Sequence, residues 1–282
     1  MEAAVREGPA VRGPAPALGR HVRRAGEDAA TGSVLAPAGA RVGPALLGLA
    51  ATCGYDTLVV RRRPRVRILV TGDEFARSGR QGPGRVRDAL GPLLPPLVEA
   101  AGGEVADVRH VPDRPAGSLD RHVAGPAADA DVVVVTGSTS VGVTDRLRGL
   151  LHDSGARWVV DTVACRPGHP QLLAREVSGR WVVGLPGNPY AALVAAHTVL
   201  SPLLAGLTGR PLPRLPAVPL TGPVRTAPGR TRLVPVVWEG SAARVTGGHR
   251  AAFLHGAVLA DALAAVPPHW TRSLAVPMLP LS

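Results

Sequence analysis

The fold is decided by residues 131–142, which read DVVVVTGSTSVG. Val132–Val135 is an uninterrupted apolar run, which is typical of a strand covered on both faces. The run leads directly into a loop of Gly, Ser and Thr residues. We therefore expect an α/β fold in which a mainly parallel sheet is flanked by helices on both faces.

The same alternation of strands and helices extends from residue 64 to about residue 209. Apolar segments predict further strands over 65–70, 104–108 and 181–185, and helices over 84–101, 115–128, 145–152 and 190–206. After Gly209 the composition changes, because residues 210–223 hold five prolines. Short alternating segments at 233–238 and 243–245 then predict a small β-rich C-terminal domain.

The N-terminal part of the chain is more irregular. Residues 1–20 are rich in Gly, Pro, Ala and Arg without periodicity, so we expect a flexible leader. Residues 21–63 predict a small α+β segment, with short strands near 31–39, a helix at 44–50 and a strand at 57–60. The expected domains are thus 1–20, 21–63, 64–209 and 210–282.

The formal charge of +11 comes from 32 basic residues, and every one of them is arginine. Lysine is absent, and isoleucine and asparagine occur once each, as Ile68 and Asn188. These three residue types use A/T-rich codons, so the use of arginine alone indicates a G/C-rich genome, which does not account for the excess of positive over negative charge. Nucleic acid stays a minor hypothesis, since aromatics make up only 3% of the residues.

Other features favour a cytoplasmic protein. The two cysteines lie far apart and exclude a disulfide framework, which fits a reducing compartment. We expect no membrane span and no secretory signal, because the N-terminus carries charge at once and lacks an apolar core.

Three predicted strands end in loops suited to a ligand. These loops are 71–74 (TGDE), 137–142 (GSTSVG, leading to Asp145) and 184–189 (GLPGNP). In an open α/β sheet, ligands bind beyond the carboxyl ends of the strands. The glycines allow a phosphate to approach the backbone, and the carboxylates suit Mg²⁺.

Each loop also has a plainer interpretation as a simple turn, and an acidic pair more often caps a helix or faces solvent. Asn188 argues against the plain interpretation, because the one asparagine of the chain lies in such a loop. No P-loop, dinucleotide-binding glycine pattern, zinc spacing or nucleophile elbow is present. We expect three histidines on solvated surfaces, namely His110, His122 and His152.

Several strings, taken in order, resemble the molybdopterin molybdenumtransferase family, the molybdate insertases that include the gephyrin E-domain type. The resemblance covers roughly residues 20–282 and is carried by RAGED at 24–28, PAG at 37–39, TGDE at 71–74, VPD at 111–113, TGSTSVG at 136–142, RPGHP at 166–170 and GLPGNP at 184–189.

The resemblance implies a molybdopterin-binding α/β domain over 64–209 followed by a small β domain. It implies a Mg²⁺-dependent enzyme that inserts molybdate into adenylylated molybdopterin, releases AMP and works as a homodimer. Motif by motif, the family's acidic residues fall on Glu74, Asp113 and Asp145, which would hold the cation and the diphosphate. The pterin-binding positions fall on Thr71, Gly72, Gly137, Ser138, Ser140, Gly142, Arg166, His169, Pro186, Gly187, Asn188 and Pro189.

The sequence also departs from the family pattern. The family's long N-terminal region has no counterpart here, so we expect an N-terminally truncated, diverged member. Two family lysines are replaced by Arg166 and His169, and the residues after Asp88 are apolar. The alternative is therefore a non-catalytic molybdopterin-binding module, or a partner subunit of a full-length insertase or a molybdoenzyme.

Overall fold

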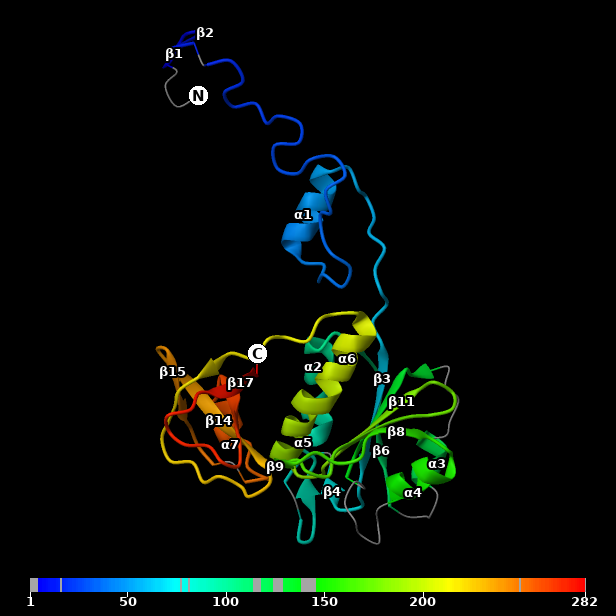
Figure 1. Cartoon of the computed structure of the whole chain (residues 1–282). Helices are drawn as coiled ribbons and strands as arrows, with labels where there is room; N and C mark the ends of the chain where they lie inside the picture. The colour runs from blue at the N-terminus through cyan, green and yellow to red at the C-terminus, as the bar shows by residue number, and fades with distance from the viewer. Residues whose placement is uncertain are drawn as a thin grey trace. The chain divides into compact units, whose positions relative to one another are not determined.

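The valine run forms strand β7 (Val132–Thr136) inside a mixed sheet (Figure 1). Val132 and Val134 pack into one apolar cluster and Val133 and Val135 into another, and all four side chains are fully buried. Alternate side chains of a strand point to opposite faces, so both faces of the sheet are covered. The prediction of a doubly covered strand is confirmed.

The sheet has the strand order β6-β3-β7-β11-β10-β8. The neighbours β6, β3, β7 and β11 run parallel, whereas β10 and β8 are antiparallel additions at one side. The carboxyl ends of the four parallel strands therefore meet at one edge. The bounds are β3 (Arg65–Thr71), β6 (Glu104–Val111), β8 (Arg157–Val160), β10 (Leu172–Arg175) and β11 (Trp181–Leu185).

Helices lie on both faces, as the sequence predicted. One face packs against α2 (Leu90–Ala100), α5 (Pro189–Ala195), a π-helical turn η2 (Ala196–Leu200) and α6 (Ser201–Thr208). The other face packs against α3 (Ser118–Val123) and α4 (Arg146–Asp153). The mainly parallel sheet with helices on both faces is thus the observed fold.

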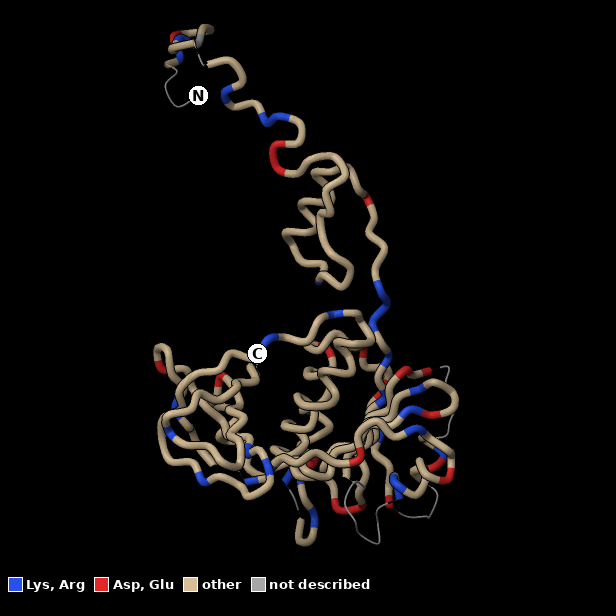
Figure 2. The backbone as a smooth tube through the Cα atoms, in the orientation of Figure 1, with Lys and Arg blue, Asp and Glu red and all other residues tan. Residues whose placement is uncertain are grey.

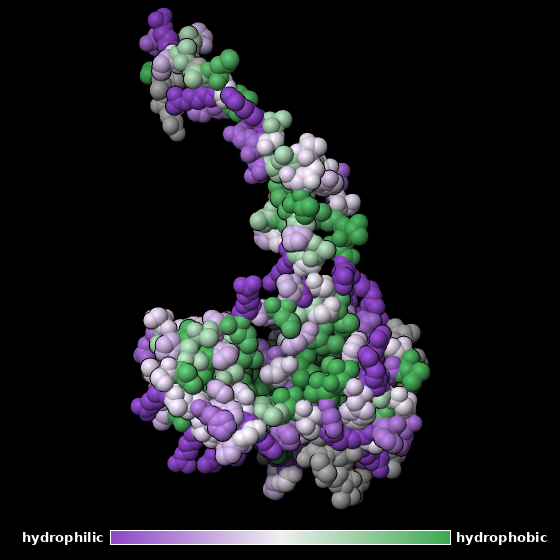
Figure 3. Space-filling model, in the orientation of Figure 1, coloured by the Kyte–Doolittle hydropathy of each residue, from purple (hydrophilic) through white to green (hydrophobic). Residues whose placement is uncertain are grey.

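The continuous helix Pro189–Thr208 is long and apolar enough to cross a membrane, which the sequence analysis did not expect. Half of its most apolar window is buried inside the protein, against the sheet, as in the core helix of a globular domain. In Figure 3, hydrophobic residues also reach the surface over α2 and α6. Partly buried leucines of these helices are Leu93, Leu97, Leu203 and Leu207.

Helix α2 begins six residues later than predicted. Val86–Arg87 forms a short strand β5 that pairs with β4 (Phe75–Ala76), so the chain before Asp88 is extended. Asp88 Oδ1 then accepts hydrogen bonds from the N–H groups of Leu90 and Gly91, at 2.8 and 2.9 Å. Such a carboxylate starts a helix by satisfying its free amides.

The C-terminal residues form the expected β-rich part, a sheet in the order β12-β17-β16-β14-β15-β13. Its elements are β12 (Ala217–Val218), β13 (Leu220–Thr221), β14 (Thr231–Glu239), β15 (Ala242–Val245), α7 (His255–Val258), β16 (Ala262–Val266) and β17 (Val276–Pro280). A short strand of the α/β part, β9 (Cys165–Arg166), pairs in parallel with β14. The two parts are therefore joined through main-chain hydrogen bonds.

The structure describes residues 5–15, 17–76, 78–80, 82–113, 118–123, 129–137, 146–248 and 250–281. By their internal contacts these fall into two units, Met1–Val59 and Val60–Ser282. All of the elements above belong to the second unit.

The first unit holds a hairpin of β1 (Val5–Glu7) and β2 (Ala10–Arg12), and the helix α1 (Pro44–Thr52). The predicted helix at 44–50 is confirmed. The strands predicted near 31–39 and at 57–60 are wrong, because these residues form turns and extended chain without a pairing partner among the described residues. A local apolar pattern does not make a strand when no second strand lies beside it.

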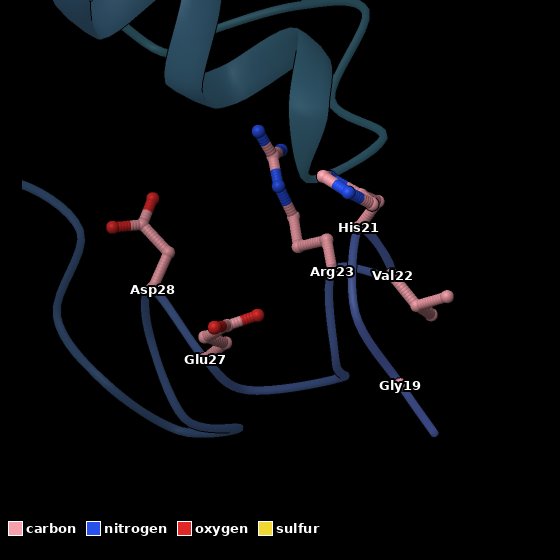
Figure 4. Close-up of a pocket in the computed structure, with 6 residues that line it drawn as sticks. All are labelled: Gly19, His21, Val22, Arg23, Glu27 and Asp28. Carbon is pink, nitrogen blue, oxygen red and sulfur yellow. The ribbon is translucent and has the colours of Figure 1, made fainter. Parts of the chain in front are cut away.

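A hollow of about 590 Å³ lies within this first unit, on the loop that carries the RAGED string (Figure 4). Its lining residues are Gly19, His21, Val22, Arg23, Glu27 and Asp28. All of them are exposed to solvent, and the loop is held only by local turns such as the contact from Arg24 N–H to Glu27 Oε2 at 2.9 Å. The hollow is an open surface and encloses no ligand cavity.

Candidate functional site

The ends of β3 and β7 are joined by a tight polar contact. Thr71, the last residue of β3, is buried, and its Oγ1 donates to the carbonyl of Thr136 at 2.6 Å. The following Gly137 has φ +73°, and a Cβ added there would lie 2.8 Å from Thr71 Oγ1. Only glycine fits this position without strain, so the two loops approach each other closely.

The loop after β11 closes the same junction from the other side. Gly137 N–H donates to the carbonyl of Leu185 at 3.0 Å, and a Cβ added at Gly187 would lie 3.6 Å from Gly137 Cα. Pro186 is buried, whereas Gly187 and Asn188 are exposed. The predicted loops therefore meet at one edge of the sheet, as the parallel topology requires.

Asn188 is the N-cap residue of α5, and Pro189 is the first residue of that helix. The Asn188 side chain makes no capping hydrogen bond, although Asn is a residue type that often does so. Capping therefore does not explain why the chain has an asparagine here. Its exposed side-chain amide can contact a ligand, whereas Pro189 has no N–H and the Ala191 N–H already donates to the Ala251 carbonyl at 3.0 Å.

Two acidic loops lie beside this junction. Gly72 N–H donates to the carbonyl of Val111 at 3.2 Å, and Asp113 N–H donates to Asp73 Oδ1 at 3.1 Å. The loops after β3 and β6 are thus tied together, with Asp73, Glu74 and Asp113 all exposed. The Glu74 carboxylate folds back over Gly72, since a Cβ added at Gly72 would lie 2.5 Å from Glu74 Oε2.

A metal centre made by the protein alone is not found in the described part of the chain, where no three His, Cys, Asp or Glu side chains converge. Mg²⁺ usually takes only one or two carboxylates together with substrate phosphates and water. The exposed carboxylates of Glu74 and Asp113 fit that kind of donor set. Four predicted residues lie outside the described residues, namely Ser138, Ser140, Gly142 and Asp145.

The RPGHP loop lies against α5, whose first turn carries Pro189. A Cβ added at Gly168 would lie 3.2 Å from Val194 Cγ1 and 3.3 Å from the Ala191 carbonyl. Arg166 is exposed, and His169 Nδ1 lies 2.8 Å from the Val163 carbonyl. If that nitrogen carries the ring proton, it donates to the carbonyl and holds the imidazole in place.

The sequence analysis missed a second arginine beside Arg166. The parallel pairing of β9 with β14 places Arg232 in register with Arg166. Burial and the charge of Arg166 lower the pKa of Arg232, and its buried Nε has no hydrogen-bond partner among the described residues. The neighbouring guanidiniums of Arg166 and Arg232, with an N–H donor left over, form a candidate anion-binding site. No sequence signal showed this, because it depends on the register between two domains.

His110 is the clearest departure from the predicted surface. Its side chain is only 15% exposed, its Nε2 lies 3.0 Å from Asp88 Oδ2, and its ring meets Phe75 edge to face. The prediction of a solvated His110 is wrong, because Phe75 of β4 and Asp88, just before α2, lie against its ring. Asp88 thus joins the helix start to the strand that leads to Asp113.

We expect Asp88→Ala to lower the free energy of unfolding by about 1–2 kcal/mol, because two helix N–H groups lose their acceptor. Asp88→Asn retains an oxygen acceptor and a group that can bond His110, so it should cost less. Urea unfolding of both variants measures the difference. Equal losses would show that the negative charge, and not the capping geometry, matters at this position.

Charge is distributed unevenly along the second unit. In Figure 2, basic and acidic residues are mixed over the α/β part, whereas residues 210–282 carry eight arginines and only two carboxylates. Several arginines are already paired with carboxylates, for example Arg67 with Asp107 at 2.8 Å and Arg180 with Glu176 at 2.8 Å. The pairing removes part of the positive charge of the α/β part, and aromatic residues that could stack on bases make up only 3% of the sequence, so nucleic acid stays a minor hypothesis.

Comparison with known proteins agrees with the resemblance seen in the sequence. Residues 67–206 match the family described as "Probable molybdopterin binding domain". The chain is 36% identical over 209 residues to molybdopterin molybdenumtransferase 2 of Mycobacterium tuberculosis, covering 70% of this chain and 50% of that protein. It is 34% identical over 236 residues to the molybdopterin molybdenumtransferase of Synechococcus elongatus, covering 80% and 58%. The chain thus spans about half the length of the curated relatives it matches.

Solved structures share the fold. A molybdopterin biosynthesis MoeA protein from Pyrococcus horikoshii superposes with a TM-score of 0.76 at 24% identity, covering all of this chain and 71% of that one. A molybdenum cofactor biosynthesis protein from Pyrococcus furiosus gives a TM-score of 0.67 at 22% identity, covering 90% and 82%. At this identity the likeness establishes the α/β and β architecture.

Proposed function

Since the chain belongs to the molybdopterin molybdenumtransferase family, we propose that it inserts molybdate into adenylylated molybdopterin and releases AMP. The observation that carries the proposal is the junction of three loops at one sheet edge. Gly137, Gly187 and Thr71 bring main chain together there, with carboxylates on one side and the first turn of α5 on the other.

The junction suits a phosphorylated pterin. The glycines let a ligand approach the main chain closely, and the start of α5 adds the favourable end of a helix dipole. Asn188 offers an amide that is not used for capping. In this proposal the pterin phosphate and diphosphate lie over Thr71, Gly72, Gly137 and the Pro186–Pro189 loop, with Ser138, Ser140 and Gly142 completing the cradle.

The acidic and the basic side chains of the site would bind different groups of such a substrate. Glu74 and Asp113, together with Asp145, would hold Mg²⁺, which when bound neutralises diphosphate oxygens. Arg166 and Arg232 would hold an oxyanion, since Arg presents several N–H donors in a fixed plane. His169 positions the loop between them through the contact with the Val163 carbonyl.

The test is AMP release from adenylylated molybdopterin in the presence of molybdate and Mg²⁺, measured by chromatography on the full chain. We expect Glu74→Gln to lower the rate at least about 100-fold, because a substrate-aligning carboxylate is lost. Glu104→Gln is the matched control. Glu104 is exposed at the amino end of β6, so it lies at the opposite edge of the sheet from the loop junction. Its rate should equal that of the parent.

A second candidate function follows from Arg166 and His169, which stand where the family has lysine. With these replacements the chain would bind the pterin without inserting the metal, alone or as the partner of a full-length insertase or a molybdoenzyme. Tight pterin binding with no AMP release above background selects this alternative. Neither binding nor release would overturn both candidates.

Further expectations belong to the same proposal. They are the division into 1–20, 21–63, 64–209 and 210–282, a cytoplasmic location and a homodimer. The hydrophobic surface over α2 and α6 supports association with a second copy (Figure 3). Sedimentation velocity of the full chain measures the oligomeric state directly.

A further inference from the structure

A buried hydrogen-bond network connects the core helix Pro189–Thr208 to the RPGHP loop. Gln171 is fully buried, and its Nε2 donates to Cys165 Sγ at 3.3 Å while its Oε1 accepts from Thr198 Oγ1 at 2.8 Å. Cys165 Sγ in turn donates to the Pro167 carbonyl at 3.3 Å. A buried amide costs free energy unless both of its ends are bonded, and here both ends are.

The Cys165 thiol in the middle of this hydrogen-bond network stays protonated. Burial raises the pKa of Cys165, so at neutral pH its sulfur carries the proton that Pro167 accepts. A thiol can accept from Gln171 and donate to Pro167 at the same time. Donation therefore runs in one direction from Gln171 through Cys165 to the Pro167 carbonyl.

Thr198 lies in the π-helical turn between α5 and α6. Its single hydroxyl proton can be donated to Gln171 Oε1 at 2.8 Å or to the Val194 carbonyl at 2.9 Å. A π-helical turn interrupts the regular helix and is frequent at functional sites. Here the interruption lies in the helix whose first turn carries Asn188 and Pro189. One helix thus carries a ligand loop at its start and a polar anchor further along.

The main chain of the RPGHP loop is fixed on the same helix. Gly168, with φ +99°, lies so close to α5 that a side chain would meet Val194 and the Ala191 carbonyl. Val163 N–H donates to the His169 carbonyl at 3.1 Å and closes the loop across its base. Only Arg166 extends away from this packed base into solvent.

We infer that Gln171 and Thr198 are positioning residues that hold the Arg166–His169 loop in register with the Asn188–Pro189 loop. Through this hydrogen-bond network both loops are fixed to the core helix. The position of one loop therefore determines the position of the other at a ligand that contacts both. The inference rests on the proposed function only in taking the Arg166 loop to hold an anionic group of the substrate.

A cysteine of the protein itself can be used to measure opening of the Arg166–His169 loop. It has two cysteines, of which Cys53 is exposed and Cys165 is buried under the loop. In the full chain carrying Cys53→Ser, the rate of labelling by a maleimide measures how often Cys165 becomes accessible. We expect Thr198→Val, which preserves shape and removes the hydroxyl, to raise this rate about tenfold, the factor of one lost buried hydrogen bond.

Matched variants separate this effect from a general loss of stability. Thr198→Ser restores the hydroxyl and should label at the parent rate. The Thr208 hydroxyl contacts Leu204, Ala205 and Arg210 but, in the described part of the chain, no residue of the loop, so Thr208→Val should also label at the parent rate. Gln171→Met, which is close in shape, should give the same acceleration as Thr198→Val. Labelling that is nearly independent of low urea concentrations identifies local opening.

Equal labelling of Thr198→Val and the parent would overturn the inference, and so would equal acceleration in Thr208→Val. Sodium molybdate should slow labelling of the parent by occupying the loop, and this protection should weaken in Thr198→Val. If molybdate has no effect on the parent while Thr198→Val still accelerates labelling, the anion role of Arg166 fails and the positioning role stands.

Discussion

Gly137→Ala is expected to weaken binding of adenylylated molybdopterin at least about 100-fold and to lower the free energy of unfolding by about 2 kcal/mol. A side chain at φ +73° costs about 1–2 kcal/mol by itself. The added Cβ would also lie 2.8 Å from Thr71 Oγ1, which bonds the Thr136 carbonyl. Relief requires the β3 and β7 loops to separate at the place where the pterin phosphate is proposed to lie.

Gly206→Ala is the control for this prediction. Gly206 lies within α6, its φ is not positive and an added Cβ would meet nothing within 4 Å. We expect binding within a few fold of the parent and a gain in stability of up to about 1 kcal/mol, since alanine is the better helix former. Calorimetric titration and urea unfolding give both quantities. Parent-like binding by Gly137→Ala would show that the substrate lies elsewhere.

The central sheet could be predicted from sequence because its signals are local and repeated. The buried valines of β7 and the apolar β3 and β11 are short runs that leave no alternative to a covered strand. Parallel order then places the loops after them at one edge. The errors occurred where structure depends on partners, as at 57–60, which lacks a neighbouring strand among the described residues.

The candidate site divides in the same way. Thr71, Gly137 and Gly187 could be predicted because each lies within two residues of the end of a strand. Arg232 could not, since only the register of β14 against β9 brings it to Arg166. His110 was misassigned for the same reason, because its partner Asp88 lies 22 residues earlier and reaches it only when α2 packs. Contacts of this kind depend on tertiary structure.

Tyr190→Ala is expected to have the largest effect on stability, a loss of about 3–5 kcal/mol. Tyr190 is fully buried, and its hydroxyl donates to the Leu233 carbonyl of β14 at 3.0 Å. Burial raises the pKa of this hydroxyl far above its usual value, so it remains a donor at any pH that the fold tolerates. The ring fills a cluster shared by both parts of the unit, with Cys165, Val194, Leu233, Ala257 and Leu263.

Tyr190→Phe separates the two contributions. It removes the hydrogen bond and retains the ring, so it should cost about 1 kcal/mol. If it costs as much as Tyr190→Ala, the hydroxyl and not the packing joins the two parts.

Tryptophan fluorescence can follow the unfolding of each part separately. Trp158 and Trp181 lie in the α/β part, and Trp238 and Trp270 lie in the β-rich part after residue 209. Two variants with phenylalanine at one pair or the other report unfolding of each part. In the parent the two urea transitions should coincide, since one cluster and the β9–β14 pairing connect the parts. With Tyr190→Ala the β-rich part should unfold at a lower urea concentration than the sheet. Coincident transitions in that variant would mean that the main-chain pairing of β9 with β14 is sufficient to couple the two parts.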